Sequence, residues 1–384
     1  MRIGFDLRTL AEGKATGVEI YTESLLSALL NIDQENEYRI FYNSYHFSKT
    51  DLGRFARKNT ILSINRFPNR LLNLSMLALK RPYLDRLLGG LDLFFSPRYL
   101  FTAVSRNCPL VVTMHDLSFI HFPDFFSVKQ RVWHSIVSDK TACNAASAVI
   151  AVSDSTKRDI IETFLLPSEK IFTVCPGLDH GKFHSRRSAE NDGKLKNTYN
   201  LRKPYMLYLG TIEPRKNIMG VISGFETLMK KKQYDIDLVL AGGLGWLYKK
   251  ILKRIEVSPF KARIRLLGRV QENFKTSLYQ MAEVFIFPSF FEGFGFPPLE
   301  AAACGTPVIA AHNSSAFEVL RNSALYVNPY DSEQIARGLE SLLADRELKE
   351  EYAKRGMENV KRFTWERTAE QTLQVFKQAA GRRS

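Results

Sequence analysis

The strongest constraint on the fold of this chain is a repeated alternation between short apolar runs and longer segments with helical spacing. Continuous apolar strands that alternate with helices form parallel sheets, which helices cover on both faces. The pattern therefore predicts an α/β fold with two doubly wound domains, one in each half of the chain. The runs lie at residues 3–7, 38–42, 91–95, 110–114, 148–152 and 171–174, and then at 205–209, 237–240, 264–267, 284–287, 307–310 and 324–327.

The stretch 184–202 separates these halves, and it consists mainly of Ser, Arg, Lys, Asn, Asp and Gly. Because so few apolar residues occur in it, we interpret it as a linker. A first domain then covers residues 1–183 and a second covers 203–365, which suits a chain of 384 residues. Two such domains would face each other across a cleft, with ligands at the carboxyl ends of the strands.

Membrane and redox signals are weak along the whole sequence. No apolar run approaches the roughly 18 to 20 residues that cross a bilayer, and the chain passes from Met1 directly into a charged strand. We therefore expect neither a signal peptide nor a membrane span.

The cysteines at 108, 143, 175 and 304 show no paired spacing, which favours reduced thiols over disulfides or a zinc site. These features predict a cytoplasmic protein.

The formal net charge of +14 is unevenly distributed. Residues 181–270 carry 20 basic and 7 acidic side chains, whereas residues 49–106 carry eleven basic side chains against Asp51, Asp85 and Asp92. In the second stretch apolar residues are interleaved with the charges, so it could lie on an anionic membrane surface, where each basic residue contributes about 1 kcal/mol. A solvated helical face over a local core is an equal alternative.

A helix start is expected at Thr16-Gly17, where Val18, Tyr21 and Leu25 follow with the spacing of a helix laid on a sheet. A strand, a glycine-bearing loop and a helix N-terminus together form a ready anion site. A plain tight turn at Gly17 would give the same pattern.

Two carboxylates occur together in the segment 289–308. A strand ends at Pro288, a glycine-containing loop holds Glu292, and a helix is expected after Pro297-Pro298 with Glu300 in its first turn. Carboxylates accept hydrogen bonds from hydroxyl groups, which ribose and hexoses supply in number. With the backbone amides of residues 293–295, the segment predicts a cradle for a sugar.

Two cations follow another predicted strand, in the segment 210–217. Arg215 offers a planar fork of donors and Lys216 a point charge, a combination that suits a diphosphate. An isolated Arg-Lys pair is usually solvated, but this one lies between a strand and a helix, where ligands bind in such folds.

Taken in order, these motifs resemble those of retaining glycosyltransferases of family 4, which have the GT-B fold of two Rossmann-like domains. The resemblance extends over essentially the whole chain. It rests on Glu292-x7-Glu300 with the following Ala-Ala-Ala-Cys-Gly-Thr-Pro-Val-Ile, on Glu213-Pro-Arg-Lys-Asn, and on Gly4-Phe-Asp-Leu-Arg-Thr, His115-Asp-Leu-Ser-Phe, Val152-Ser-Asp-Ser-Thr, Pro176-Gly-Leu-Asp and Phe363-Thr-Trp-Glu.

The resemblance implies a role for each residue of the sugar cradle. Glu292 would hydrogen-bond a hydroxyl of the transferred sugar, and the amides of Gly293, Phe294 and Gly295 would hold neighbouring hydroxyls. Glu300 would bind the ribose of the nucleotide.

It also implies how the phosphates and the reacting sugar are held. Arg215 and Lys216 would clamp the diphosphate with help from Gly17, and His115 would hydrogen-bond the reacting sugar. A histidine satisfied by core backbone is the alternative for His115, and Asp116 would orient its loop. The implied reaction retains the anomeric configuration, and the departing phosphate helps to take the proton of the acceptor.

The segments 314–319 and 115–120 look most like those of mannosyltransferases of surface polysaccharide assembly, lipopolysaccharide included. GDP-mannose is therefore the favoured donor, with UDP-sugars as the alternative, and a glycan or lipid-linked glycan is the expected acceptor. The resemblance further implies that no metal cofactor is needed and that a last helix, 366–384, crosses back to the first domain.

Three other functions stay open. A nucleotide-sugar epimerase on the same fold would use the same binding groups, as would a non-catalytic nucleotide-sugar binder. A nucleic-acid binder is suggested by charge alone, and because the sequence contains no recognised nucleic-acid module, no nucleic-acid partner is expected.

Overall fold

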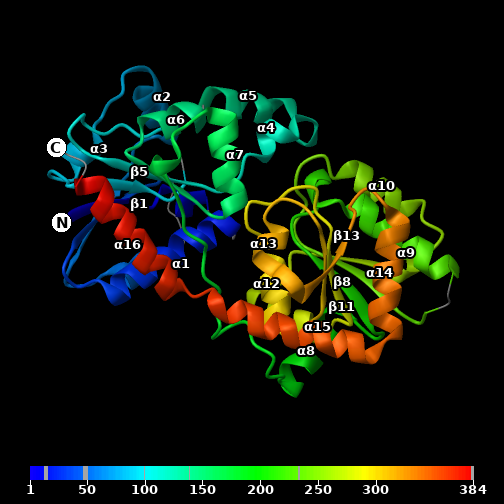
Figure 1. Cartoon of the computed structure of the whole chain (residues 1–384). Helices are drawn as coiled ribbons and strands as arrows, with labels where there is room; N and C mark the ends of the chain where they lie inside the picture. Colours follow the sequence, from blue (N-terminus) through cyan, green and yellow to red (C-terminus); the bar gives the residue numbers. More distant parts are fainter. Residues whose placement is uncertain (13–15, 46–50, 99, 138, 232–233, 382–384) are drawn as a thin grey trace. The chain divides into compact units, whose positions relative to one another are not determined.

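The structure is a computed structural model (Figure 1) that describes residues 1–12, 16–45, 51–98, 100–137, 139–231 and 234–381. Residues 49, 50 and 99 of the basic stretch and residues 382–384 of the expected last helix therefore lie outside the described residues. The chain forms two compact units. Unit 1 comprises Met1–Leu117, Val132–Gly177 and Phe363–Ser384, and unit 2 comprises Ser118–Arg131 and Leu178–Arg362.

Unit 1 is built on a sheet of seven parallel strands in the order β3-β2-β1-β4-β5-β6-β7. All six apolar runs predicted in this half form strands. The strands are β1 (Arg2–Asp6), β2 (Glu37–Asn43), β3 (Thr60–Asn65), β4 (Leu93–Ser96), β5 (Leu110–Met114), β6 (Ala148–Ala151) and β7 (Ile171–Thr173).

Unit 2 has six parallel strands in the order β10-β9-β8-β11-β12-β13. The strand order reverses between β8 and β11, as in a Rossmann sheet. Again every predicted run forms a strand. These strands are β8 (Tyr205–Leu209), β9 (Asp237–Ala241), β10 (Ile264–Gly268), β11 (Val284–Phe287), β12 (Val308–Ala311) and β13 (Ala324–Val327).

The helices connect these strands in the alternation that the sequence predicts. In unit 1 they are α1 (Gly17–Ile32), α2 (Asn69–Ala78), α3 (Leu84–Leu87), α6 (Asp139–Ala145), α7 (Asp154–Phe164) and α16 (Trp365–Gly381), together with most of α5 (Val128–Val137). In unit 2 they are α4 (Ser118–His121), α8 (Ala189–Tyr199), α9 (Ile218–Lys231), α10 (Lys249–Glu256), α11 (Lys275–Gln280), α12 (Phe296–Ala303), α13 (Ala316–Leu320), α14 (Ser332–Ala344) and α15 (Arg346–Asn359). Throughout the described ranges, no helix is both long and apolar enough to span a bilayer.

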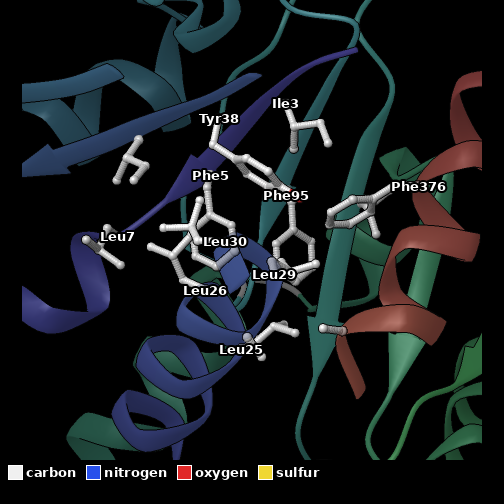
Figure 2. Close-up of a cluster of buried hydrophobic side chains, with 14 of the residues drawn as sticks. Ile3, Phe5, Leu7, Leu25, Leu26, Leu29, Leu30, Tyr38, Phe95 and Phe376 are labelled. Atoms are coloured by element: carbon white, nitrogen blue, oxygen red, sulfur yellow. The ribbon is translucent and has the colours of Figure 1, made fainter. Parts of the chain in front are cut away.

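The core of unit 1 is shared between the two ends of the chain. Figure 2 shows Phe5 of β1, Phe95 of β4 and Leu29 of α1 gathered with Phe376 of α16, and all four side chains are fully buried. The rings of Phe95 and Phe376 lie 5.0 Å apart between centroids. Helix α16 therefore belongs to the first unit, where the resemblance led us to expect the last helix.

The segment 184–202, which we interpreted as a linker, contains helix α8. Ser188 caps its N-terminus by accepting a hydrogen bond from the Asn191 amide at 3.4 Å, and Asn200 ends it in the left-handed conformation. Leu195 is fully buried in the helix. Asp192 is also buried and pairs with Arg187 at 2.7 Å. The boundary between the units falls earlier, at Gly177–Leu178.

Candidate active site

Two loops of unit 2 lie together because their strands are neighbours. Strand β8 runs into the loop with Arg215 and Lys216, and strand β11 runs into the loop with Glu292. Since β8 and β11 pair in parallel at the point where the strand order reverses, both loops leave the same edge of the sheet, where such folds bind ligands. The Phe290 amide donates a hydrogen bond to the Arg215 carbonyl at 3.0 Å and joins the two loops.

The side chains of these loops form a compact charge cluster. Lys216 Nζ lies 2.6 and 2.7 Å from the two carboxylate oxygens of Glu292, and Arg215 Nη1 lies 3.4 Å from the same carboxylate. All three side chains are 12% exposed. The structure thus brings together three residues that the sequence predicted to share a site.

A fourth member of the cluster, Glu213, was not assigned a role from the sequence. Its carboxylate accepts a hydrogen bond from Arg215 Nη2 at 3.1 Å, while Arg215 Nη1 donates to the Phe291 carbonyl at 2.8 Å. Glu213 is only 2% exposed, and burial raises its pKa. Its place in the motif Glu213-Pro-Arg-Lys-Asn is a signal that could have identified it.

The loop that carries Glu292 is fixed by side chains that follow strand β12. The Glu292 amide donates to Ser314 Oγ at 3.1 Å, and Ser315 Oγ donates to the Glu292 carbonyl at 2.9 Å. Asn313 Nδ2 donates to the Phe290 carbonyl at 2.8 Å. The hollow behind the loop has a volume of about 10 Å³, which is room for at most one water. The Glu292 backbone is therefore held by packed protein.

Aromatic residues also hold this loop, and they come from the segment Ser118–Arg131. We expected these residues in the first domain, but the structure groups them with unit 2. The Phe125 ring stacks on Phe290 with centroids 5.2 Å apart, and Phe122 lies 5.9 Å from Phe291. Phe126 also stacks on Trp246 with centroids 5.3 Å apart, so aromatic contacts join this segment to unit 2.

Gly295 ends the loop at a φ of +95°, where a side chain would be strained, and helix α12 begins at the next residue. Our prediction placed Glu300 in the first turn of this helix, which is wrong. Pro297 and Pro298 lie inside the helix rather than before it, because proline is tolerated at the first helical positions. Glu300 consequently lies one turn deeper.

Glu300 is nearly enclosed, with 6% of its surface exposed. Its carboxylate accepts a hydrogen bond from the Tyr279 hydroxyl at 2.8 Å. Burial raises the pKa of Glu300, against the opposing effect of the Lys275 charge. The predicted ribose ligand is thus a carboxylate with a fixed position, held by a partner outside the Glu292 cluster.

His115 lies in unit 1, where it follows strand β5. Its Nε2 is 2.8 Å from the Pro97 carbonyl, and its ring packs edge-on against Tyr21 at 5.0 Å. Burial lowers the pKa of His115 to about 4, so the ring is neutral at pH 7. A carbonyl only accepts, so Nε2 carries the proton and Nδ1 is left as an acceptor.

Gly17 is the first residue of α1, and the residue before it caps the helix. Thr16 Oγ1 accepts a hydrogen bond from the Glu19 amide at 3.4 Å, and the Glu19 carboxylate accepts one from the Thr16 amide at 2.9 Å. This capping box places a negative charge at the helix N-terminus. The Glu19 carboxylate thus binds the Thr16 amide, directly before the predicted anion site at Gly17.

Comparison with known proteins agrees with this architecture. Residues 192–359 match the family model described as glycosyl transferases group 1, and residues 15–182 match that of glycosyltransferase family 4. The chain is 32% identical to the O-antigen chain mannosyltransferase B of Escherichia coli over 77% of its own length and 75% of that protein. It is 30% identical to the serotype-specific mannosyltransferase WbdA of Escherichia coli over 60% of this chain, which is 29% of that longer relative.

Among solved structures, the fold is similar to that of sucrose-phosphate synthase from Thermosynechococcus elongatus. The TM-score is 0.77 at 21% identity, and the match covers 98% of both chains. The family models, the Escherichia coli relative and the two Rossmann-like units lead to one conclusion: the chain belongs to family 4 of the group 1 glycosyltransferases, and it is a glycosyltransferase of the GT-B fold.

Proposed function

We propose that the protein transfers a mannosyl residue from GDP-mannose to a glycan or lipid-linked glycan during surface polysaccharide assembly, with retention of configuration. The observation that carries the proposal is the cluster of Lys216, Arg215 and Glu292, in which cations for a diphosphate lie beside a carboxylate for sugar hydroxyls. The choice of mannose rests on the Escherichia coli relative, which is named as a mannosyltransferase.

In this reaction the glycosyl–phosphate bond breaks, and the leaving diphosphate gains negative charge. Lys216 and Arg215 stabilise that charge, and because both side chains are largely buried, their effect is stronger than it would be in water. The leaving phosphate oxygen accepts the proton of the acceptor hydroxyl, whose oxygen forms the new bond to the anomeric carbon on the same face.

The remaining residues hold the donor. Glu292 accepts a hydrogen bond from a sugar hydroxyl beside the Gly293–Gly295 backbone, and Glu300 accepts one from the ribose. His115 accepts a hydrogen bond from the reacting sugar through Nδ1, the nitrogen that its contact with Pro97 leaves available. Gly17 assists at the diphosphate. No step requires a metal.

We propose a cytoplasmic location, with peripheral contact to the inner face of the membrane. A lipid-linked acceptor lies at that surface, and the basic stretch 49–106 of unit 1 is suited to an anionic lipid surface. Nucleic acid is not a proposed partner.

A thermal-shift panel of GDP, UDP, GDP-mannose and UDP-glucose tests the donor. A ligand at 100 times its dissociation constant adds about 2.7 kcal/mol of stability, so a specific nucleotide gives a clear shift. Stabilisation by uridine nucleotides alone would replace GDP-mannose with a UDP-sugar.

The two other functions that would use the same binding groups, epimerisation and non-catalytic binding, are tested separately. Incubation with the donor alone separates transfer from epimerisation, because an epimerase converts the donor without consuming an acceptor. A non-catalytic binder would bind the donor with no turnover on any mannosyl acceptor.

A further inference from the structure

Helix α2 of unit 1 presents an apolar side to solvent. Its inner side buries Leu72 and Met76, whereas Leu71, Leu74 and Leu77 are 63%, 59% and 44% exposed. A helix on the surface of a globular protein normally carries polar residues on its outer side. Single exposed leucines need no explanation, but adjacent ones indicate a surface that binds something.

The spacing along α2 places these leucines on one continuous surface. Leu74 and Leu77 are three residues apart, as are Leu71 and Leu74, and residues at this spacing are neighbours on a helix. Phe67 just before the helix and Leu79 just after it are 43% and 71% exposed. We call this surface the α2 face and define it as Phe67, Leu71, Leu74, Leu77 and Leu79.

The charges next to the α2 face in the sequence have one sign. Residues 52–84 lie between Asp51 and Asp85 and contain no Asp or Glu, and the basic residues next to the face are Arg66, Arg70, Lys80 and Arg81, all exposed. Asp85 is buried, and its carboxylate accepts hydrogen bonds from the amide and hydroxyl of Ser105. An apolar surface with a basic border matches the acyl chains and headgroups of an anionic bilayer.

We propose that the α2 face inserts into the headgroup region of an anionic lipid bilayer and is the membrane contact of the protein. A second copy of the chain fits this surface less well. A symmetric dimer would place the same face on both partners, so Arg70 and its basic neighbours would meet like charges, which disfavours association. The inference deepens the proposed membrane contact, because it assigns that contact to five named residues.

Flotation of the full chain with vesicles tests the proposal. One set of vesicles contains phosphatidylcholine and phosphatidylglycerol, and the other contains phosphatidylcholine alone. The protein should bind the anionic set, and binding should weaken as salt increases. The triple variant Leu71→Gln, Leu74→Gln, Leu77→Gln should lose about tenfold or more in partitioning. It should still fold, since these side chains are exposed.

Two controls isolate the α2 face. Leu165→Gln alters an exposed leucine of unit 1 outside it and should bind vesicles like the wild type. Arg70→Gln with Lys80→Gln should weaken binding severalfold, whereas the charge-matched pair Lys249→Gln, Lys250→Gln in unit 2 should not. Equal vesicle binding by the leucine triple variant and the wild type would overturn the proposal.

Two further readouts separate the remaining explanations. If the wild type formed a dimer and bound no vesicles, and the triple variant were a monomer, the α2 face would be assigned to a second copy and the proposal would be overturned. Thermal shift with GDP and GDP-mannose should be the same for the wild type and the triple variant. If neither GDP nor GDP-mannose bound the wild type or the triple variant, GDP-mannose would be excluded as the donor. The vesicle result would still stand.

Discussion

Lys216 and Glu292 form an ion pair that joins the two loops of the candidate active site, with Nζ 2.6 and 2.7 Å from the two carboxylate oxygens. In the proposed reaction this pair implies an exchange when the donor binds: the diphosphate takes Lys216, and the released Glu292 carboxylate accepts a hydroxyl of the sugar. On this proposal, a nucleoside diphosphate without a sugar releases Glu292 but gives it no new partner.

We expect Glu292→Gln to bind GDP about tenfold more tightly than the wild type and to lose turnover. The neutral amide does not compete for Lys216, and removing one partner of a buried ion pair leaves the other charge in need of a ligand. Calorimetric titration with GDP measures the affinity, and transfer from GDP-mannose measures the turnover.

Glu333→Gln is the matched control, because it breaks an exposed ion pair with Lys231 in the same unit. It should leave both quantities unchanged. Weaker binding of GDP by the Glu292→Gln variant would contradict the exchange.

Glu213→Gln should lower kcat by about tenfold while the KM for the donor changes little. Glu213 accepts a hydrogen bond from Arg215 at 3.1 Å and so orients its guanidinium. A misoriented cation stabilises less of the charge that develops in the transition state, and glutamine preserves the shape of the side chain. Steady-state kinetics check this expectation. A purely structural role would instead appear as a lower Tm with unchanged kcat.

His115 should make the stability of unit 1 depend on pH. Its pKa falls from 6.5 to about 4 on folding, so the unfolded chain binds the proton more readily between these values. The His115 contribution is therefore complete above pH 6.5 and is lost as the pH falls toward 4, with a total of about 3 kcal/mol.

The test is the difference in free energy of unfolding between the wild type and His115→Gln, measured by denaturant titration. A difference is needed because Asp139 has the opposite effect. Burial raises its pKa to about 6, so its contribution to the free energy of unfolding falls as the pH rises over much of the same range. A difference that stays constant from pH 7 to pH 4 would contradict the low pKa of His115.

Phe376→Ala should destabilise the protein by about 3 to 5 kcal/mol. The side chain is fully buried in the core of unit 1 (Figure 2) and contacts Phe95. Gln371→Ala on the same helix is the control and should cost little.

Deleting residues 366–384 should prevent unit 1 from folding, as measured by circular dichroism and limited proteolysis. A fully active truncated protein would show that the helix is dispensable.

Much of the fold could be predicted because buried parallel strands are continuous apolar runs, and each predicted run forms a strand. Strand β3 was missed for the opposite reason. It lies at the sheet edge, where it pairs with β2, and Ile61 and Ile64 remain exposed. Its sequence, Thr-Ile-Leu-Ser-Ile-Asn, is interrupted by polar residues and is not a continuous apolar run. Helix α8 was missed because Leu195 is its one buried apolar side chain, so the segment carries no apolar periodicity.

The candidate site could be predicted residue by residue but not as a set of pairs. Lys216 and Glu292 are 76 residues apart, and they meet because β8 and β11 are neighbours, which no local pattern reveals. The hydrogen-bond partner of Glu300, Tyr279, is likewise 21 residues away in the sequence. Local motifs identify the chemical groups, whereas the strand order decides which of them touch.

The return of α16 to the first unit also determines the order in which the protein can fold during synthesis. The ribosome makes Phe5 long before Phe376, so the core that joins them cannot close until helix α16 has been made. Unit 2, whose segments end at Arg362, emerges earlier. The unit that is made first is therefore finished last, and its apolar strands wait for their final helix while the nascent chain is still growing.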